Sequence, residues 1–119
     1  MSGEITLTLP VPPSVNRYWR HISINGQPRT LISEAGREYK RTVAILGCAS
    51  SPMYGPVSLA YFVYRPRKSG DLDNYLKGLL DALKGVAFID DAQVVELHGY
   101  LRDDKANPRV NVIIQEAAK

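Results

Sequence analysis

The sequence predicts an α+β fold in one small domain, residues 1–119, with a mixed or antiparallel sheet of about four main strands covered by two helices. First, period-two and β-branched stretches alternate with two amphipathic helical stretches in the order βββαβαββ. Second, 119 residues with 45% hydrophobic content suffice for a single core. Third, no repeat, low-complexity tract or linker divides the chain.

The first predicted strand ends near Leu9. Ile5, Leu7 and Leu9 alternate with threonines, which is the pattern of a half-buried strand, and the prolines of the VPPS segment that follows cannot continue it.

Asn25 and Gly26 then lie between two short β-prone stretches. Because both residues tolerate positive φ, this pair predicts an exposed hairpin.

The first helix is predicted from Ser33, as N-cap, to about Ala49. Tyr39, Val43 and Leu46 recur at helical spacing on the apolar side. The opposite face is basic and comprises Arg37, Lys40 and Arg41. Cys48, placed by this prediction on the helix among apolar residues, is expected to be a packed thiol.

The second helix is predicted from Asp71 to Lys84. Its leucines recur at steps of three and four, polar residues share the other face, and Gly85 supplies the stop. The preceding stretch VSLAYFVYR, residues 57–65, is too apolar for an edge position and is expected to be a central strand. Two further strands, around residues 94–97 and 110–114, are joined by a polar turn, which favours an antiparallel pair.

Composition excludes several classes of protein. The single cysteine cannot form an intramolecular disulfide, and no Cys/His spacing suits zinc, so a reducing compartment, the cytosol, is expected. No apolar stretch approaches the ~18 residues of a membrane span, and the N-terminus lacks a signal-peptide layout. The net charge of +3 hides an uneven distribution: residues 1–70 carry +6 and residues 71–119 carry −3.

Carboxylates spaced i, i+2 at the start of the second helix are the first candidate for chemistry. Asp71 and Asp73 have a structural alternative, because carboxylates cap helices and suit the positive end of the helix dipole. An EF-hand loop is excluded, since the ligands that it requires further along are missing. Lys77 lies one turn after Asp73, either as an i,i+4 ion pair or as a cation beside a bound phosphate.

A second acidic pair, Asp90 and Asp91, precedes a predicted strand. It can serve simply as a solvated turn. Alternatively, one aspartate of this pair could join Asp71 and Asp73 around a hard cation such as Mg²⁺, which takes two or three carboxylates together with water and phosphate oxygens.

A third segment, PVPPSVNRYWRH, alternates cations with aromatic residues. Arg17 and Arg20 with Tyr18, Trp19 and His21 suit phosphate contact and base stacking. The alternative is that the aromatic rings fill the core while the arginines face water. The histidines have no partners for a hydrolytic triad.

Taken together, these segments resemble the RusA family of Holliday junction resolvases, over nearly the whole chain. The matching motifs are LPVPPSVNRYWRH, the S-x-x-G-x-x-Y of Ser33 to Tyr39, the D-L-D-N-x-x-K of Asp71 to Lys77, the D-A-L of Asp81 to Leu83, and the D-D-A-Q-V of Asp90 to Val94. In the family, the basic run before the first aspartate is often unbroken, whereas Ser69-Gly70 interrupt it here.

The resemblance implies a RusA-like fold and a homodimeric, Mg²⁺-dependent nuclease, for which Mn²⁺ can substitute, that nicks two opposed strands of a four-way DNA junction. It implies a cytoplasmic, phage-, prophage- or bacterially encoded protein in DNA recombination and repair. By motif, the catalytic and metal-binding carboxylates are Asp71, Asp73 and Asp91, and Lys77 is the functional lysine; the role of Asp90 stays open. DNA-backbone contacts are assigned by hypothesis to Arg17, Arg20, Arg65, Arg67 and Lys68.

Two rival functions are open at this point. One is a noncatalytic binder of branched or structured nucleic acid, in which the acidic residues only cap a helix or repel negative charge. The other is a metal-dependent nuclease without preference for junctions. Cleavage of a labelled junction with and without Mg²⁺, beside a linear duplex, distinguishes the three.

Overall fold

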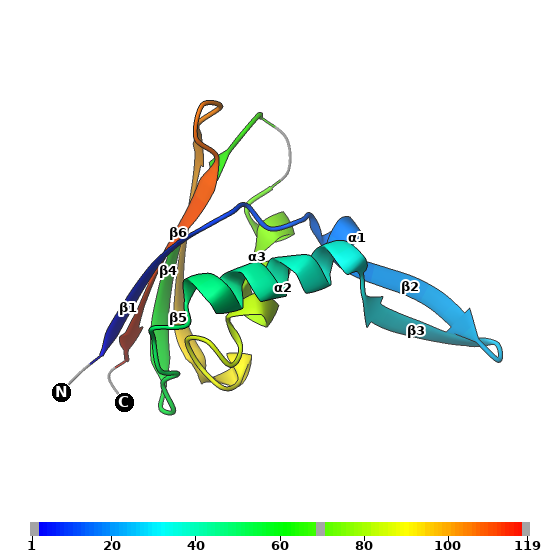
Figure 1. Ribbon diagram of the computed structural model, residues 1–119, viewed down its shortest axis with the longest axis horizontal. Helices are drawn as coiled ribbons and strands as arrows, with labels where there is room; N and C mark the ends of the chain where they lie inside the picture. The colour runs from blue at the N-terminus through cyan, green and yellow to red at the C-terminus, as the bar shows by residue number, and fades with distance from the viewer. Residues whose placement is uncertain (1–2, 69–70, 118–119) are drawn as a thin grey trace.

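The computed structural model describes residues 3–68 and 71–117, which form an α+β unit with a four-stranded mixed sheet, as predicted (Figure 1). The elements in chain order are β1 (Glu4–Leu9), α1 (Val15–Tyr18), β2 (Trp19–Ile24), β3 (Gln27–Ile32), α2 (Glu34–Leu46), β4 (Val57–Arg65), α3 (Asp73–Leu83), the 3₁₀ turn η1 (Asp91–Gln93), β5 (Val94–Asp103) and β6 (Arg109–Glu116). Helices α2 and α3 lie on the same side of the main sheet. No helix in the described ranges is long and apolar enough to cross a membrane.

Strand β4 lies inside the main sheet, which confirms the prediction of a central strand. The strand order is β1-β6-β4-β5, with β4 antiparallel to β6 and parallel to β5. The predicted pairing of the last two strands with each other is therefore wrong: β4 separates them. The connection between them passes the end of β4, where the Asp104 amide donates to the Arg65 carbonyl at 2.8 Å. The most apolar strand of the sheet gains two neighbours by this arrangement.

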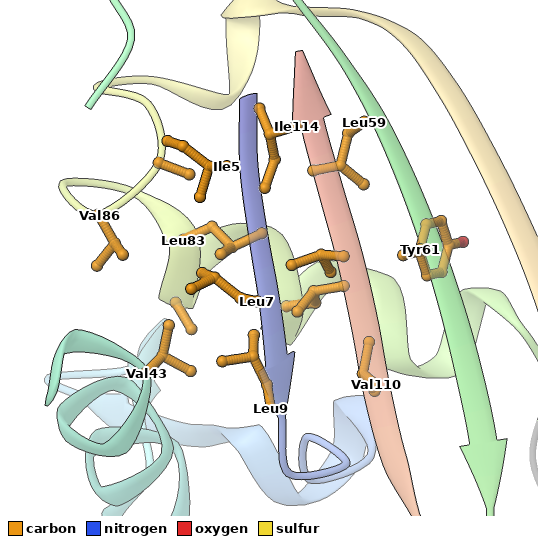
Figure 2. Close-up of a cluster of buried hydrophobic side chains, with 14 of the residues drawn as sticks. Ile5, Leu7, Leu9, Val43, Leu59, Tyr61, Leu83, Val86, Val110 and Ile114 are labelled. Carbon is orange, nitrogen blue, oxygen red and sulfur yellow. The ribbon is translucent and has the colours of Figure 1, made fainter. Parts of the chain in front are cut away.

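The core lies between the sheet and the helices, as Figure 2 shows for its central part. Strand β1 alternates exposed and buried residues, with Ile5, Leu7 and Leu9 facing inward, as predicted. The side chains of Val43 from α2 and Leu83 from α3 are fully buried against this face. Further fully buried positions are Leu59, Val63, Leu79, Val110, Val112 and Ile114.

Helix α2 begins as predicted but ends earlier. The Ser33 hydroxyl accepts a hydrogen bond from the Gly36 amide at 3.0 Å, which confirms the N-cap. The helix stops at Leu46 because Gly47 turns the chain against the core, so closely that a Cβ there would lie 2.3 Å from Val86. Cys48 is exposed in the turn beyond, so the prediction of a packed thiol is wrong.

The one-turn helix α1 was not predicted, and it carries Tyr18 into the core. The Tyr18 ring lies against two glycines, Gly36 and Gly78, where a Cβ would come within 3.3 Å and 2.9 Å of the ring. Its hydroxyl donates to Asp81 Oδ2 at 2.7 Å, and Lys40 Nζ lies 3.6 Å from the same oxygen. Tyr18 thus joins α1, α2 and α3, and the core-packing alternative holds for this ring.

Strands β2 and β3 form the predicted hairpin, a separate two-stranded sheet that extends away from the main body (Figure 1). At its tip Asn25 and Gly26 have φ angles of 52° and 77°, the left-handed conformation that the sequence pair suggested.

Buried tyrosines predict a loss of stability in alkali. Tyr18 and Tyr39 are 0% and 6% exposed, and burial raises the pKa of both phenols above the ordinary value. Since only the unfolded chain ionises readily, the free energy of unfolding is intact below about pH 10 and falls as the pH rises further, by up to about 1.4 kcal/mol per pH unit for each phenol. Urea unfolding across this range measures the effect. Tyr39→Phe should give a shallower decline, and an unchanged slope in that variant would contradict the assignment.

Candidate active site

Asp71 and Asp73 flank a packed leucine at the entry to α3. The Leu72 side chain packs against the core, and a Cβ on Gly99 of β5 would come within 2.8 Å of it. Both neighbouring aspartates are exposed. Leu72 therefore anchors the chain on the sheet while its two neighbours present carboxylates to solvent.

Neither carboxylate caps the helix with a hydrogen bond. Leu72 occupies the N-cap position without a side-chain cap, and Asp73 is the first helical residue. At Asp71 the backbone carbonyl, not the side chain, accepts a hydrogen bond from the Asn74 amide, at 3.0 Å. Proximity to the positive end of the helix dipole still favours both charges, but the capping alternative accounts for neither side chain.

A cavity of about 540 Å³ brings the predicted residues Asp71, Asp73 and Lys77 together. Among the described residues, Lys77 is not within ion-pair distance of Asp73. Its ammonium lies instead 5.6 Å from the centre of the Trp19 ring, a cation–π position. Asn74 and Val15 complete the lining. Asn74 was not predicted as a site residue, although its position directly after the D-x-D motif could have indicated it.

Asp90 has a structural role in the turn before β5. Its carboxylate accepts from the Ala92 amide at 3.1 Å, and this hydrogen bond foremost lowers the pKa of Asp90 below its ordinary value. The Gln93 side chain accepts from the amides of Ile89 and Asp90 and donates to two carbonyls of the 53–55 segment. The D-D-A-Q motif is thus a rigid support that holds Asp91 at the surface.

Asp91 lies apart from Asp71 and Asp73 within the chain. It precedes β5, and its neighbour Asp90 feels the charge of Lys84, the residue after α3, whereas Asp73 begins that helix. The 11 residues of α3 span about 16 Å, and Figure 1 shows the 84–93 segment at the other end of α3. Among residues 3–68 and 71–117, no group of three or more His, Cys, Asp or Glu side chains could hold a metal ion.

The five predicted DNA-contacting cations lie on different parts of the fold: before and on the hairpin, and at and after the end of β4. Arg17 and Arg67 are exposed and line a second, larger cavity beside the first. Arg20 is exposed on β2, and Lys68 is exposed after β4. Arg65 instead pairs with Asp103, at 2.8 Å. The Ser69-Gly70 interruption lies outside the described residues.

Comparison with known proteins identifies the family. Residues 10–115 match the family model described as Endodeoxyribonuclease RusA. The chain is 42% identical over 95 residues to the crossover junction endodeoxyribonuclease RusA of Enterobacteria phage 82, covering 76% of each chain. It is 38% identical over 96 residues to the protein of that name from Escherichia coli strain K12, covering 76% of this chain and 77% of the relative. The exposed carboxylates and the lysine line one cavity at the start of α3. By these matches, this chain belongs to the RusA family of endodeoxyribonucleases.

Proposed function

We propose that this protein is a structure-specific endodeoxyribonuclease that resolves four-way DNA junctions by paired, symmetric, Mg²⁺-dependent hydrolysis of phosphodiesters. The observation that carries the proposal is the single cavity lined by Asp71, Asp73 and Lys77. Relatives that share 38–42% identity over three quarters of the chain are named crossover junction endodeoxyribonucleases, which supports junction DNA as the substrate.

The side chains at this cavity suit a hard divalent cation. Asp71 and Asp73 offer carboxylate oxygens and Asn74 an amide oxygen, and Mg²⁺ in proteins is commonly held by one or two carboxylates together with substrate phosphates and water. When bound, the cation supplies an acidified water and positive charge for the phosphate oxygens. Without it, the two carboxylates repel the phosphate backbone.

The remaining groups orient the substrate and stabilise charge. Lys77 lines the same cavity as the two carboxylates, and its positive charge stabilises the negative charge that develops on the phosphate oxygens during hydrolysis. Its ammonium lies over the Trp19 ring, and among the described residues it is not within ion-pair distance of Asp73, so that carboxylate does not neutralise it. Arg17 and Arg67, at the adjoining cavity, contact the DNA backbone on the approach to the carboxylates.

A homodimer supplies the third carboxylate in this proposal. Asp91 lies at the far end of α3 from Asp71, so it completes the site of a second chain rather than its own. Strand β5 is an edge strand with exposed apolar residues at Val95, Leu97 and Tyr100. When two chains pair through their β5 edges about a two-fold axis, the two β5 strands run antiparallel. The start of β5 in one chain, next to Asp91, then lies toward the end of β5 in the other chain. Two equivalent sites then match the two-fold symmetry of a junction.

The direct test is cleavage of end-labelled four-way junctions with product ends mapped. We expect symmetric nicks in two opposed strands in Mg²⁺ and none after chelation, while linear duplex of the same sequence stays intact. Binding without cutting in Mg²⁺ would contradict the enzyme and support a noncatalytic junction binder. Equal cutting of the duplex would contradict junction specificity and support a general metal-dependent nuclease.

A further inference from the structure

The hairpin of β2 and β3 extends away from the main sheet and carries no carboxylate (Figure 1). Its cations are Arg20 and Arg29, and the sequence contains no Asp or Glu between Glu4 and Glu34. Both arginines are exposed, and among the described residues neither forms an ion pair. A two-stranded hairpin alone in water is only marginally stable. These strands therefore gain from a partner, and their charge favours a polyanion.

One face of the hairpin combines the two arginines with aliphatic side chains. Residues that lie opposite each other in an antiparallel pair point to the same side of the sheet. The strand register thus places six side chains on what we call the arginine face: Arg20, Ile22, Ile24, Gln27, Arg29 and Leu31. Ile24 and Leu31 are 47% and 46% exposed. The arginine face therefore presents cations and apolar groups to solvent together.

The base of the hairpin is fixed on the helices, next to the carboxylate cavity. The Ser33 amide donates to the Tyr18 carbonyl at 2.8 Å, and Trp19 packs against the core. The centre of the Trp19 ring lies 5.6 Å from the ammonium of Lys77, which lines the carboxylate cavity. At about 3.4 Å per residue, the stretch from Trp19 to Ile24 spans about 17 Å. Since duplex DNA rises about 3.4 Å per base pair, this length equals about five base pairs.

The arginine face suits duplex DNA better than other occupants. The major groove, about 12 Å wide, admits a two-stranded β-ribbon. There the arginines reach phosphates on the groove walls, while aliphatic side chains contact thymine methyl groups. Unpaired bases stack on aromatic rings, and residues 20–31 contain no Phe, Tyr or Trp. A second copy of the chain is disfavoured, because the centre of a protein interface is depleted of charged residues, whereas arginines lie among the aliphatic side chains here.

We infer that the hairpin is a DNA-binding element whose arginine face lies in the major groove of one duplex arm of the junction, about five base pairs from the phosphate at Asp71 and Asp73. The inference rests on the proposed function, since it places the scissile phosphate at the carboxylate cavity. In a homodimer, the two hairpins engage two symmetry-related arms. This contact adds affinity and orients the arm without touching the reacting atoms.

Methylation of the bound junction by dimethyl sulfate tests where the hairpin lies. The reagent attacks guanine N7 in the major groove and adenine N3 in the minor groove, and Ca²⁺ in place of Mg²⁺ keeps the junction uncut. With the unmodified protein, we expect several-fold protection of guanine N7 at about the fifth base pair from the phosphate that is nicked in Mg²⁺. Ile24→Glu, which puts a negative charge at the exposed tip, should lose this protection. Ile45→Glu, at a position of α2 that is 70% exposed, is the matched control and should retain it.

The salt dependence of junction binding tests the arginine contacts. When the logarithm of the binding constant is plotted against that of the salt concentration, each lost phosphate contact reduces the slope by about 0.9. Arg29→Gln should reduce the slope by this amount for each hairpin engaged. Arg41→Gln removes an exposed charge from α2 and should leave the slope unchanged. Equal slopes in these two variants would contradict phosphate contact by the hairpin.

The footprint also has outcomes that overturn the inference. These are the absence of protection at that distance, protection of adenine N3 instead of guanine N7, and protection that persists in Ile24→Glu. Dissociation of the dimer by Ile24→Glu in sedimentation without DNA would assign the arginine face to a second copy instead. Cutting is measured separately. If the footprint holds while no junction is cut in Mg²⁺, the nuclease proposal fails and the hairpin contact stands; normal cutting without the footprint has the opposite meaning.

Discussion

Asp71→Asn and Asp91→Asn should each lose Mg²⁺-dependent junction cutting, on the order of a thousandfold, while binding the junction within about threefold of the unmodified protein. Each change keeps the shape of the side chain but removes one of the charged ligands that we propose for a divalent cation. Single-turnover cleavage measures the loss, and gel mobility shift in Ca²⁺ measures binding. Glu116→Gln removes one carboxylate at the exposed end of β6 and should cut normally.

Mixing the two inactive variants tests the shared site. If Asp91 acts across the dimer, a mixed dimer has one site carrying both substitutions and one site carrying neither. Random exchange should then restore about a quarter of the active sites, seen as single nicks rather than paired ones. If all ligands came from one chain, both sites of the mixed dimer would be damaged. No gain of nicking after exchange would therefore contradict a site completed by the partner chain.

Tyr18→Ala should lower the free energy of unfolding by about 3–5 kcal/mol. The ring is fully buried between helices α2 and α3, against Gly36 and Gly78, so its removal leaves a cavity that these glycines cannot fill. It also leaves Asp81, which accepts from the hydroxyl at 2.7 Å, without that donor. Urea unfolding measures the change.

Two further variants separate packing from hydrogen bonding at Tyr18. Tyr18→Phe keeps the ring and should cost about 1.5–3 kcal/mol, the usual range for a hydrogen bond to a charged group. Tyr54→Ala, at a ring that is 80% exposed, should stay within about 0.5 kcal/mol of the unmodified protein. Equal losses for the alanine substitutions at Tyr18 and Tyr54 would contradict the role of Tyr18 as a bridge between the helices.

Local features of the fold were predictable because neighbouring residues encode them. The alternation of β1, the Ser33 cap and the Asn25-Gly26 turn all depend on residues a few positions apart. The same holds in part for the shared cavity of Asp71, Asp73 and Lys77, since Lys77 follows Asp73 by about one helical turn and Asp71 lies two residues before Asp73, at the entry to α3.

The spatial arrangement of residues that are far apart in the sequence could not be predicted in this way. The adjacency of β5 and β6 along the chain suggested an antiparallel pair, yet β4 lies between them because strand order depends on which strands together cover the core. Cys48 was expected inside, but the turn at Gly47, packed on Val86, leaves it exposed. The motif around Asp91 resembled a metal site, and only the fold shows Asp90 and Gln93 bracing the turn.

By itself, the sequence determined the α+β class, the family resemblance and the residue types that carry the chemistry, since these follow from composition, periodicity and short motifs. The tertiary structure alone decided that Asp91 lies at the opposite end of α3 from Asp71, that Lys77 faces Trp19, and that a cavity opens beside the carboxylates. Those relations join residues that are tens of positions apart, and packing of the whole chain, rather than any local pattern, brings such residues together or keeps them separate.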